Sequence, residues 1–485
     1  MARKLNIAVQ GCCHGMLDNI YNHLLAQQKQ KKVDLLIICG DFQAIRNITD
    51  LKCMSCPDKY KQIGGFYRYY SGEKTAPVPT IFIGGNHEAG NHSREIYYGG
   101  WVAKNIYFLG NSGVVKFGGL RIGGISGIFK DFDYHKGYYE LPPFRGHSRS
   151  SMHHVRSYEA FKMLQIRWPL DIMISHDWPQ YIERYGDTEG LLKKKPFFKK
   201  EVDCGDLGSP VNAMLLERLR PAWWLSAHLH VRFTAKVDAN ESIFPEGWAG
   251  VAPRSTDTAE ANPANTDEIA ISDDEFAFSE PSNGTQVAAP DAKNSTAIPT
   301  KADNVCRGPT QFLALDKCLP RRQFLEIIEV EAPDNAADKE LKLEYDPEWL
   351  AILRLCHPYM PLDEAPFDPP ASGATPLFSD ELVNKEMDWV MKNIFADGPK
   401  YIPENFVPVA PVPPPGTPDT ANFGIARNDR GRGPGYDRHG QRNVRNVRNG
   451  SEWPGPLPYF INANPQTEDF CKMLGIQDQL TQRLH

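Results

Sequence analysis

The chain has 485 residues, 41% of them hydrophobic, so it is long enough for one large domain, a smaller one and connecting segments. Its formal net charge of −6 excludes the global basic field that many nucleic-acid-binding proteins carry, so any RNA contact must come from local basic surface. The N-terminus has no long apolar core, and the sequence predicts neither a signal peptide nor a membrane span. The ten cysteines lack framework spacing, which favours free thiols in a reducing compartment.

Short apolar runs alternate with helical patterns up to about residue 235. Apolar residues at helical spacing predict helices at Leu17–Leu25 and at Val211–Leu219, the second ended by Pro221. Glycine-rich turns join three expected strands, at Asn105–Leu109, Val114–Phe117 and Leu120–Ile125. Strand–helix units followed by a meander predict an α/β fold, a β-sandwich of two mixed sheets flanked by helices.

The composition changes after residue 237. Asp238–Arg307 contains thirteen acidic and four basic residues and few large apolar ones, so residues 238–307 are predicted to be disordered. Alternating strands resume at Phe312–Asp316 and Gln323–Val330. The acidic segment is therefore expected to be an insertion inside the sandwich, which residues 308–332 close.

The last third of the chain predicts a small, mostly helical C-terminal domain over residues 333–402, where Trp349, Leu350 and Leu353 have helical spacing. Residues 403–455 are expected to be disordered, because Val407–Pro418 is rich in proline and seven arginines lie between Arg427 and Arg448. Residues 456–485 contain enough apolar side chains to pack back on the C-terminal domain.

Five polar signatures stand in one order along the chain: Gly11-Cys12-Cys13-His14, Gly40-Asp41, Gly85-Asn86-His87-Glu88, Ser175-His176-Asp177 and Ala227-His228-Leu229-His230. Each follows an apolar run that predicts a buried strand: Leu5–Val9, Leu35–Cys39, Thr80–Ile83, Asp171–Ile174 and Trp223–Ser226. Ligands at strand ends are held rigidly while they point into a shared cleft, which suits a two-metal hydrolytic centre. Single histidines such as His23, His92 and His357 are better explained by packing or surface positions.

This order of signatures resembles that of the calcineurin-like metallophosphoesterases, with Cys12 where the superfamily usually has Asp. The run Gly11–Gly15 that contains this departure resembles one branch, the RNA lariat debranching enzymes. Four other stretches are similar to that family: Phe66–Lys74, Tyr98–Trp101, Ile122–Lys130 and Phe312–Pro320. The resemblance covers most of residues 5–235, which makes residues 1–237 the first part of a metallophosphoesterase catalytic domain, and it resumes at about residues 310–330 and 464–476.

The resemblance implies two divalent cations that share Asp41, whose carboxylate is able to bridge them. One cation would also be held by Asn86, His176 and His228, and the other by His14, His230 and Cys12, unless the Cys12 thiol only lies nearby. These mixed donors fit Fe²⁺, Zn²⁺ or Mn²⁺, and Mg²⁺ least well. His87 would act as the general acid.

An aromatic and basic stretch between Gly127 and Arg156 is expected to form a loop because of Gly137, Pro142 and Pro143. Rings that stack on unpaired bases, next to cations that hold phosphates, are the usual means of gripping single-stranded RNA. The stretch (about residues 127–156) resembles the segment that embraces the branch point in the debranching family, although single rings could instead pack on the sandwich. The candidate RNA-binding residues are Phe129, Lys130, Tyr134, His135, Lys136, Tyr138 and Tyr139, with Arg68, Tyr69 and Lys74 from a second patch that is alternatively a buried aromatic cluster.

The resemblance implies hydrolysis of the 2′–5′ phosphodiester of excised intron lariat RNA, in intron turnover after pre-mRNA splicing. The products would be linear RNA with a 5′-phosphate and a free 2′-hydroxyl. It implies branched RNA as the partner, splicing-associated proteins as partners of the disordered segments, and a nuclear location with shuttling to the cytoplasm as an option. The alternatives are another calcineurin-like nuclease or cyclic-nucleotide phosphodiesterase and, from a different class, an inactive scaffold.

Overall fold

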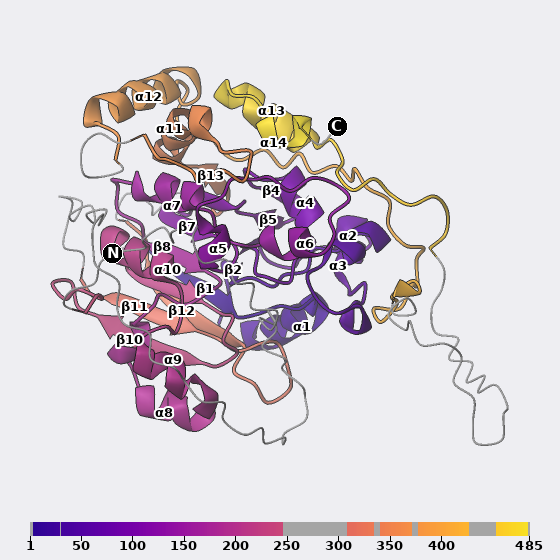
Figure 1. Ribbon diagram of the computed structural model, residues 1–485, viewed down its shortest axis with the longest axis horizontal. Helices are drawn as coiled ribbons and strands as arrows, with labels where there is room; N and C mark the ends of the chain where they lie inside the picture. The colour runs from indigo at the N-terminus through magenta and orange to yellow at the C-terminus, as the bar shows by residue number, and fades with distance from the viewer. Residues whose placement is uncertain are drawn as a thin grey trace.

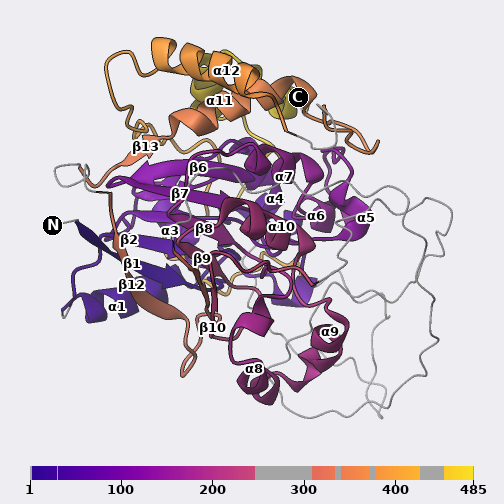
Figure 2. The same cartoon turned by 90° about the vertical axis from the view of Figure 1, so that its left-hand side faces the viewer.

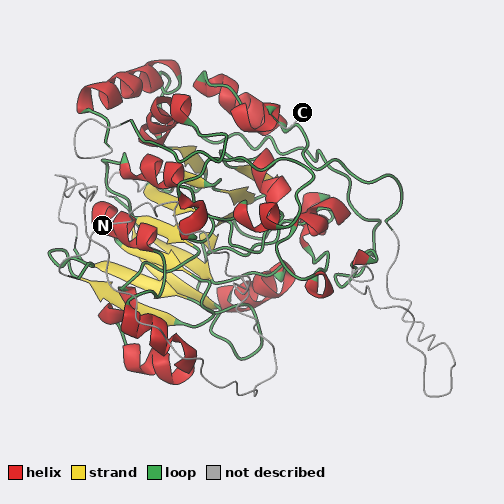
Figure 3. Ribbon diagram, viewed as in Figure 1, coloured by secondary structure: helices red, strands yellow, loops and turns green. Residues whose placement is uncertain are grey.

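The computed structural model describes residues 3–29, 31–245, 308–333, 340–370, 377–425 and 453–483. Two mixed β-sheets pack face to face, and helices cover the outer faces (Figures 1 and 3). The predicted sandwich is therefore confirmed. In the part of the chain that is described, no helix is long and apolar enough to cross a membrane.

The first sheet has six strands in the order β12-β1-β2-β3-β5-β4. Their bounds are Lys4–Gln10 for β1, Leu35–Ile38 for β2, Thr80–Phe82 for β3, Gly100–Ala103 for β4, Ile106–Phe108 for β5 and Leu325–Glu331 for β12. The four inner strands run parallel, and β12 and β4 are the antiparallel edges. The carboxyl ends of β1, β2 and β3 therefore meet at one edge of the sheet.

The second sheet has seven strands in the order β10-β11-β9-β8-β7-β6-β13. Their bounds are Ser112–Phe117 for β6, Leu120–Ile125 for β7, Ile172–Ser175 for β8, Trp223–Ser226 for β9, Phe233–Val237 for β10, Thr310–Ala314 for β11 and Leu343–Tyr345 for β13. Strands β7, β8, β9 and β11 are parallel. Buried aliphatic side chains of both sheets, such as Ile7 and Ile37 opposite Ile174 and Leu225, form the core between them. Strands buried on both faces explain the continuous apolar runs in the sequence.

The helices have the following bounds: α1 Leu17–Gln28, α2 Ile48–Cys53, α3 Phe66–Tyr70, α4 Gly90–Glu95, α5 Asp131–Tyr134, α6 His147–Ser151, α7 Ser157–Leu164, α8 Thr188–Lys194, α9 Lys199–Cys204, α10 Pro210–Leu219, α11 Pro347–Cys356, α12 Asp380–Asn393, α13 Pro465–Leu474 and α14 Gln479–Gln482. Helix α1 packs its apolar face on the first sheet, as its spacing predicts. Helices α7 and α10 cover the second sheet, together with α11 and α12. Ser209 caps α10 and Asp346 caps α11, and each helix has Pro at its first position.

The C-terminal helices lie above β13 and β6 (Figure 2). The described part of residues 333–402 is mostly helical, as predicted, and it also contains β13, which pairs antiparallel with β6 and extends the second sheet. The last segment also reaches further than predicted. The Gln466 side chain on α13 exchanges two hydrogen bonds with the Trp101 backbone on β4, so residues 456–485 pack on the sandwich as well as on the C-terminal helices.

Residues 403–425, which the composition predicts to be disordered, are packed against the N-terminal half of the chain. We call them the C-terminal strap. The Tyr70 hydroxyl accepts the N–H groups of Val409 and Ala410 at 2.7 and 2.9 Å, and Ile63 donates its N–H to the Ala421 carbonyl at 2.9 Å. A proline-rich chain has few N–H groups to satisfy and loses less conformational entropy when it is ordered, so it packs without hydrophobic periodicity.

The first residues of the predicted acidic insertion are packed on the sandwich. Residues 238–245 are described, and Ile243 is buried and donates its N–H to Glu217 at 3.1 Å. The rest of the predicted insertion, residues 246–307, and the arginine-rich tract within residues 426–452 lie outside the described residues. Their predicted disorder stays a prediction.

Candidate metal centre

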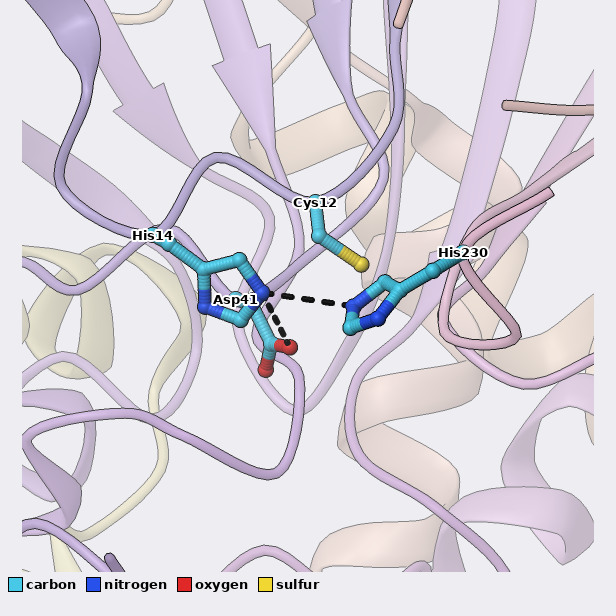
Figure 4. A group of neighbouring side chains, drawn as sticks. All are labelled: Cys12, His14, Asp41 and His230. Atoms are coloured by element: carbon cyan, nitrogen blue, oxygen red, sulfur yellow. Dashed lines mark hydrogen bonds and ion pairs between the residues drawn. The ribbon is translucent and has the colours of Figure 1, made fainter. Parts of the chain in front are cut away.

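The five polar signatures follow the carboxyl ends of β1, β2, β3, β8 and β9. Four of their side chains, Cys12, His14, Asp41 and His230, form a group whose ligand atoms all lie within 4.8 Å of one another (Figure 4). His14 Nε2 is 3.3 Å from His230 Nε2 and 3.7 Å from Asp41 Oδ2. The structure thus brings together one of the two ligand sets expected from the sequence.

Two members of the other set, His176 and His228, also lie at Asp41. His176 Nε2 is 3.4 Å from Asp41 Oδ2, and the rings of His176 and His228 have centroids 5.0 Å apart. His176 Nδ1 lies 2.8 Å from the Cys39 carbonyl and donates to it, because a carbonyl only accepts. In the neutral ring the proton is therefore on Nδ1, and Nε2 has a lone pair for a metal ion. Asp41 is therefore shared between both groups of side chains.

Three buried polar atoms at this centre have no hydrogen-bond partner in the described part of the chain: Asn86 Oδ1, His176 Nε2 and His230 Nδ1. Each unpaired buried atom costs about 1–3 kcal/mol, and such atoms are rare in folded proteins. Two of them, on Asn86 and His176, belong to the second expected set. A cation there would give these oxygen and nitrogen atoms a partner, so the residues present fit divalent metal ions.

The backbone at the ligand positions is held in an unusual conformation. His14, Asp41, His228 and His230 have φ values of 47°, 46°, 61° and 49°, in the left-handed region that L residues rarely adopt. Such strain costs of order 1–3 kcal/mol at each residue and persists only where the surrounding fold enforces it. Its concentration on four expected ligands marks this edge of the sandwich as a functional site.

Two glycines of the signatures allow the ligands to approach one another. A Cβ on Gly40, which has a φ of 107°, would lie 2.3 Å from His176 Nδ1. A Cβ on Gly85 would lie 2.2 Å from Asp41 Oδ1. Any side chain at either position would push a ligand away, which explains why glycine precedes both Asp41 and Asn86.

The electrostatics suit metal binding. Burial lowers the pKa of His14 to about 4, of His228 to about 3 and of His230 to about 2, so these imidazoles are neutral at pH 7. Burial opposes ionisation of Asp41, but His176, whose own pKa the Asp41 charge raises against its burial, holds the pKa of Asp41 well below the usual value. The centre therefore offers neutral nitrogens and one carboxylate to a cation.

Cys12 is fully buried, and its Sγ accepts the N–H of His228 at 3.3 Å. Burial, with the nearby charge of Asp41, raises the pKa of the thiol well above its usual value. A cation within the group would favour the thiolate instead, because a coordinated thiol is deprotonated. The position of Sγ agrees with a ligand at this site.

His87 lies beside the centre, with its ring centroid 6.0 Å from that of His14. Its backbone N–H donates to Asp41 Oδ1 at 3.0 Å, and its Nδ1 lies 3.1 Å from the Ser55 carbonyl. Because a carbonyl only accepts, Nδ1 carries a proton, and Nε2 is the ring atom left to exchange a proton with a substrate.

Glu88 is a residue whose role the sequence reasoning missed. Its buried carboxylate accepts the N–H groups of Phe42 at 2.6 Å, Gln43 at 2.7 Å and Gly85 at 3.0 Å. It thereby ties the loop after Asp41 to the loop that carries Asn86 and His87. The only signal in the sequence is its place at the end of the third signature.

Asp177, by contrast, does not hydrogen-bond to a histidine ring among the described contacts. Its Oδ1 accepts the N–H of Trp178 at 2.9 Å, which is a turn contact. Burial raises its pKa to about 6. We therefore assign Asp177 a role in the turn that follows β8.

The segment at residues 127–156 is a loop interrupted by the short helices α5 and α6. Asp133 is its hub, because its carboxylate is 2.6 Å from His154 Nδ1, 3.0 Å from His147 Nε2 and 3.0 Å from Lys136 Nζ. Burial opposes ionisation, but hydrogen bonds from these three side chains, His147 foremost, hold the pKa of Asp133 well below its usual value. The loop is therefore internally braced.

The candidate RNA-binding residues of this loop divide into two groups. Tyr134 and Tyr138 are buried, and Tyr138 donates its hydroxyl to Glu159, so both rings pack on the sandwich. The remaining five are partly exposed: Phe129, Lys130, His135, Lys136 and Tyr139. Phe132, which was not among the candidates, is 47% exposed and is the most accessible ring of the loop.

The second candidate RNA patch is engaged internally. Arg68, Tyr69 and Lys74 all reach the carboxylate of Asp18, at 3.1, 2.6 and 2.5 Å. Arg68 also forms an ion pair with Asp419 of the strap at 2.5 Å. The structure therefore gives these three residues a packing role, the alternative that the sequence left open, and does not present them as a free RNA surface.

Comparison with known proteins agrees with this geometry. Residues 5–232 match the family model of the calcineurin-like phosphoesterases, so the fold and its centre define a metallophosphoesterase that uses divalent metal ions. Residues 307–479 match the model of the lariat debranching enzyme C-terminal domain.

The chain resembles several characterised relatives over most of its length. It is 40% identical over 477 residues to the lariat debranching enzyme of Homo sapiens, covering 98% of this chain and 70% of the human one. It is 42% identical over 430 residues to that of Schizosaccharomyces pombe, with 84% and 90% covered. The chain therefore belongs to the lariat debranching enzyme family. It spans 66% of the length of the Danio rerio relative, to which it is 39% identical over 478 residues.

Proposed function

We propose that this chain hydrolyses the 2′–5′ phosphodiester at the branch point of excised intron lariats. The products are a linear RNA with a 5′-phosphate and a free 2′-hydroxyl. The observation that carries the proposal is the group of Cys12, His14, Asp41 and His230, assembled within 4.8 Å in a chain of the debranching family. His176, an expected ligand of a second cation, lies 3.4 Å from the same carboxylate.

Two divalent cations fit the donor set. Cys12, His14, Asp41 and His230 would hold one, and Asp41, Asn86, His176 and His228 the other. Imidazole, amide, carboxylate and thiolate donors together favour Fe²⁺, Zn²⁺ or Mn²⁺ over Mg²⁺. When bound, such a pair of cations supplies the charge that holds a phosphodiester and activates water.

The chain's own residues then handle the leaving group. Water attacks the phosphorus in line and releases a proton to solvent, the bond from phosphorus to the 2′ oxygen breaks, and His87 Nε2 donates its proton to that oxygen. The Ser55 carbonyl fixes the ring through Nδ1, and the Asp41 carboxylate fixes the His87 backbone. The acid is thus held at a set position beside the centre.

The partly exposed residues of the loop at 127–156 support recognition of unpaired RNA near the branch. Phe129 and Tyr139 offer rings for stacking, and Lys130 and Lys136 offer cations for phosphates. Lys136 Nζ also lies 5.5 Å from the centroid of the Tyr139 ring, so the two form one aromatic and basic surface.

We further infer a nuclear site of action, with shuttling to the cytoplasm as an option, because excised introns arise in the nucleus. The acidic insertion and the arginine-rich tract would serve splicing-associated proteins. Both roles rest on composition alone.

The function is tested by product analysis. Purified, metal-loaded protein is incubated with branched RNA in ¹⁸O-labelled water, and the ends of the products are determined. A linear strand with one ¹⁸O in its 5′-phosphate, together with a free 2′-hydroxyl, supports the proposal. Intact branched RNA, or protein that purifies without stoichiometric metal, would instead favour a scaffold.

A further inference from the structure

The segment that orients His87 is covered by the C-terminal strap, residues 403–425. The Ser55 carbonyl accepts the proton of His87 Nδ1, and Ser55 lies just after α2, between Met54 and Ile63, which are buried. Two strap carbonyls hold the far end of this segment. Ala421 accepts the N–H of Ile63 at 2.9 Å, and Asp419 accepts that of Gly64 at 3.0 Å.

Gly64 connects the strap to the metal-ligand loop. A Cβ on Gly64, which has a φ of 66°, would lie 3.7 Å from Gly15 Cα. Gly15 directly follows the expected ligand His14. The backbone at Gly64 is therefore enclosed between the strap on one side and the first metal signature on the other.

An apolar cluster joins the strap to both ends of the Ser55–His87 contact. The strap contributes Ala421, Phe423 and Ile425, all buried. The same cluster contains Met54, which precedes Ser55, and Ala89, which is two residues beyond His87. Phe423 has a φ of 51°, a conformation that only its packing can maintain. A loss of volume at Phe423 would loosen the support behind the contact.

Polar contacts fix the position of the strap. Arg68 binds both carboxylate oxygens of Asp419, at 2.5 and 3.2 Å. The Tyr67 hydroxyl donates to the Thr417 carbonyl at 2.6 Å. Helix α3, which carries both donors, directly follows the segment that contains Ser55 and Gly64. The strap is therefore anchored on α3, directly after the residues it covers.

We propose that the C-terminal strap is a positioning element of the catalytic centre, which holds the Ser55 carbonyl in place and through it sets the orientation of the His87 ring. The proposal rests on the proposed function, in which His87 protonates the departing 2′ oxygen. Part of the C-terminal domain then serves the chemical step, although it contributes no ligand and no acid.

This role has a chemical signature that a general loss of stability lacks. A sugar alkoxide is a poor leaving group and needs the proton of His87, whereas nitrophenolate leaves without one. A displaced His87 should therefore slow cleavage of branched RNA and leave hydrolysis of bis(p-nitrophenyl) phosphate unchanged.

The test compares wild type, Phe423→Ala and His87→Ala on both substrates, with metal content measured for each. We expect Phe423→Ala to lower kcat on branched RNA by about 10-fold to 100-fold at unchanged KM, because small misplacements of a catalytic group have effects of that size. The rate of Phe423→Ala on the nitrophenyl ester should equal that of wild type, and His87→Ala gives the loss on branched RNA that complete removal of the acid causes. Phe395→Ala removes a similarly buried ring from the C-terminal helices and should change neither rate.

Asp419→Ala, which removes the ion pair with Arg68, replaces Phe423→Ala if that variant does not fold. If the strap variant cleaves branched RNA at the wild-type rate, or loses activity equally on both substrates, the inference is wrong. The proposed function still stands in that case, provided that the wild-type protein cleaves branched RNA. Wild-type protein that hydrolyses the nitrophenyl ester and leaves branched RNA intact would overturn the proposed function, and the inference with it.

Discussion

The carboxylate of Asp41 accepts the backbone N–H of His87 at 3.0 Å, so the residue shared by both groups of ligands also fixes the residue placed to act as the acid. The contact uses Oδ1, while Oδ2 faces the rings of His14 and His176. The contact involves only the backbone of His87, so it remains when the His87 side chain is replaced by mutation. Ligation and proton transfer are therefore separable by mutation.

We predict that His87→Ala retains its metal ions and loses turnover on branched RNA by ~10²–10⁴-fold, the usual contribution of a general acid. The backbone contact to Asp41 survives the substitution, so the ligands keep their positions. Single-turnover cleavage and metal analysis of the same preparation test this. Loss of metal from the variant would show that His87 is a ligand.

Glu88→Gln should destabilise the protein by about 1–3 kcal/mol. The side-chain NH₂ of Gln cannot accept a hydrogen bond, so at least one of the three buried N–H donors loses its acceptor. The loops of Asp41 and Asn86 would separate, so metal affinity should fall with stability. Urea unfolding and metal titration of the variant and the wild type measure both effects. Unchanged affinity would mean that Glu88 does not hold the two loops together.

Asp133→Asn should loosen the loop at 127–156 and raise KM for branched RNA, with hydrolysis of bis(p-nitrophenyl) phosphate unchanged. The folded-state pKa of Asp133 is depressed, so its stabilising contribution is complete above the unfolded value of about 4 and declines as the pH falls below it. The difference in unfolding free energy between wild type and variant should thus shrink from pH 7 to pH 3. A difference that is constant over this range would contradict the ionic role.

Cys12→Ser should weaken the site that contains His14 and His230 more than the one that contains Asn86. A hydroxyl is a poorer ligand than a thiolate for Zn²⁺ or Fe²⁺. Titration of Fe²⁺, Zn²⁺ and Mn²⁺ into metal-free wild type and variant decides the matter. If the binding curves coincide, Cys12 only fills space beside the centre.

Residues 246–304 should be removable without loss of core activity when a short flexible linker replaces them. Strands β10 and β11 pair antiparallel, with Val237 opposite Thr310, so the chain leaves and re-enters the sheet at neighbouring points. The deletion starts after the packed residues 238–245, later than the composition alone suggested. Protein that no longer folds would show that the deleted residues contribute structure.

The sequence predicted the sandwich and the expected ligands well because both depend on local pattern. Each ligand follows an apolar run, and parallel strands bring their carboxyl ends to one edge whatever the rest of the chain does. That ground places the ligands at one edge, whereas the grouping of Cys12, Asp41 and His230 around one cation came from the family resemblance. The left-handed backbone at these positions could not be foreseen, since it is imposed by tertiary contacts.

The errors have a common cause, because they concern partners that lie far away in the sequence. Arg68 and Lys74 were candidate RNA contacts, but both pair with Asp18 of α1. Tyr138 and Phe132 look alike in a loop, although one is buried and the other exposed. The strap has no periodicity to predict its packing, and partners such as the Tyr70 hydroxyl come from the folded N-terminal half.

The central claim is that the centre cleaves a 2′–5′ branch, and the most direct measurement compares two isomers of one short RNA that differ only in that linkage. One carries the 2′–5′ bond and the other the ordinary 3′–5′ bond, and both are incubated with the metal-loaded protein and with protein treated with a chelator. Rapid cleavage of the branched isomer alone, abolished by the chelator, is the predicted result. Equal cleavage of both isomers, or of neither, would contradict it.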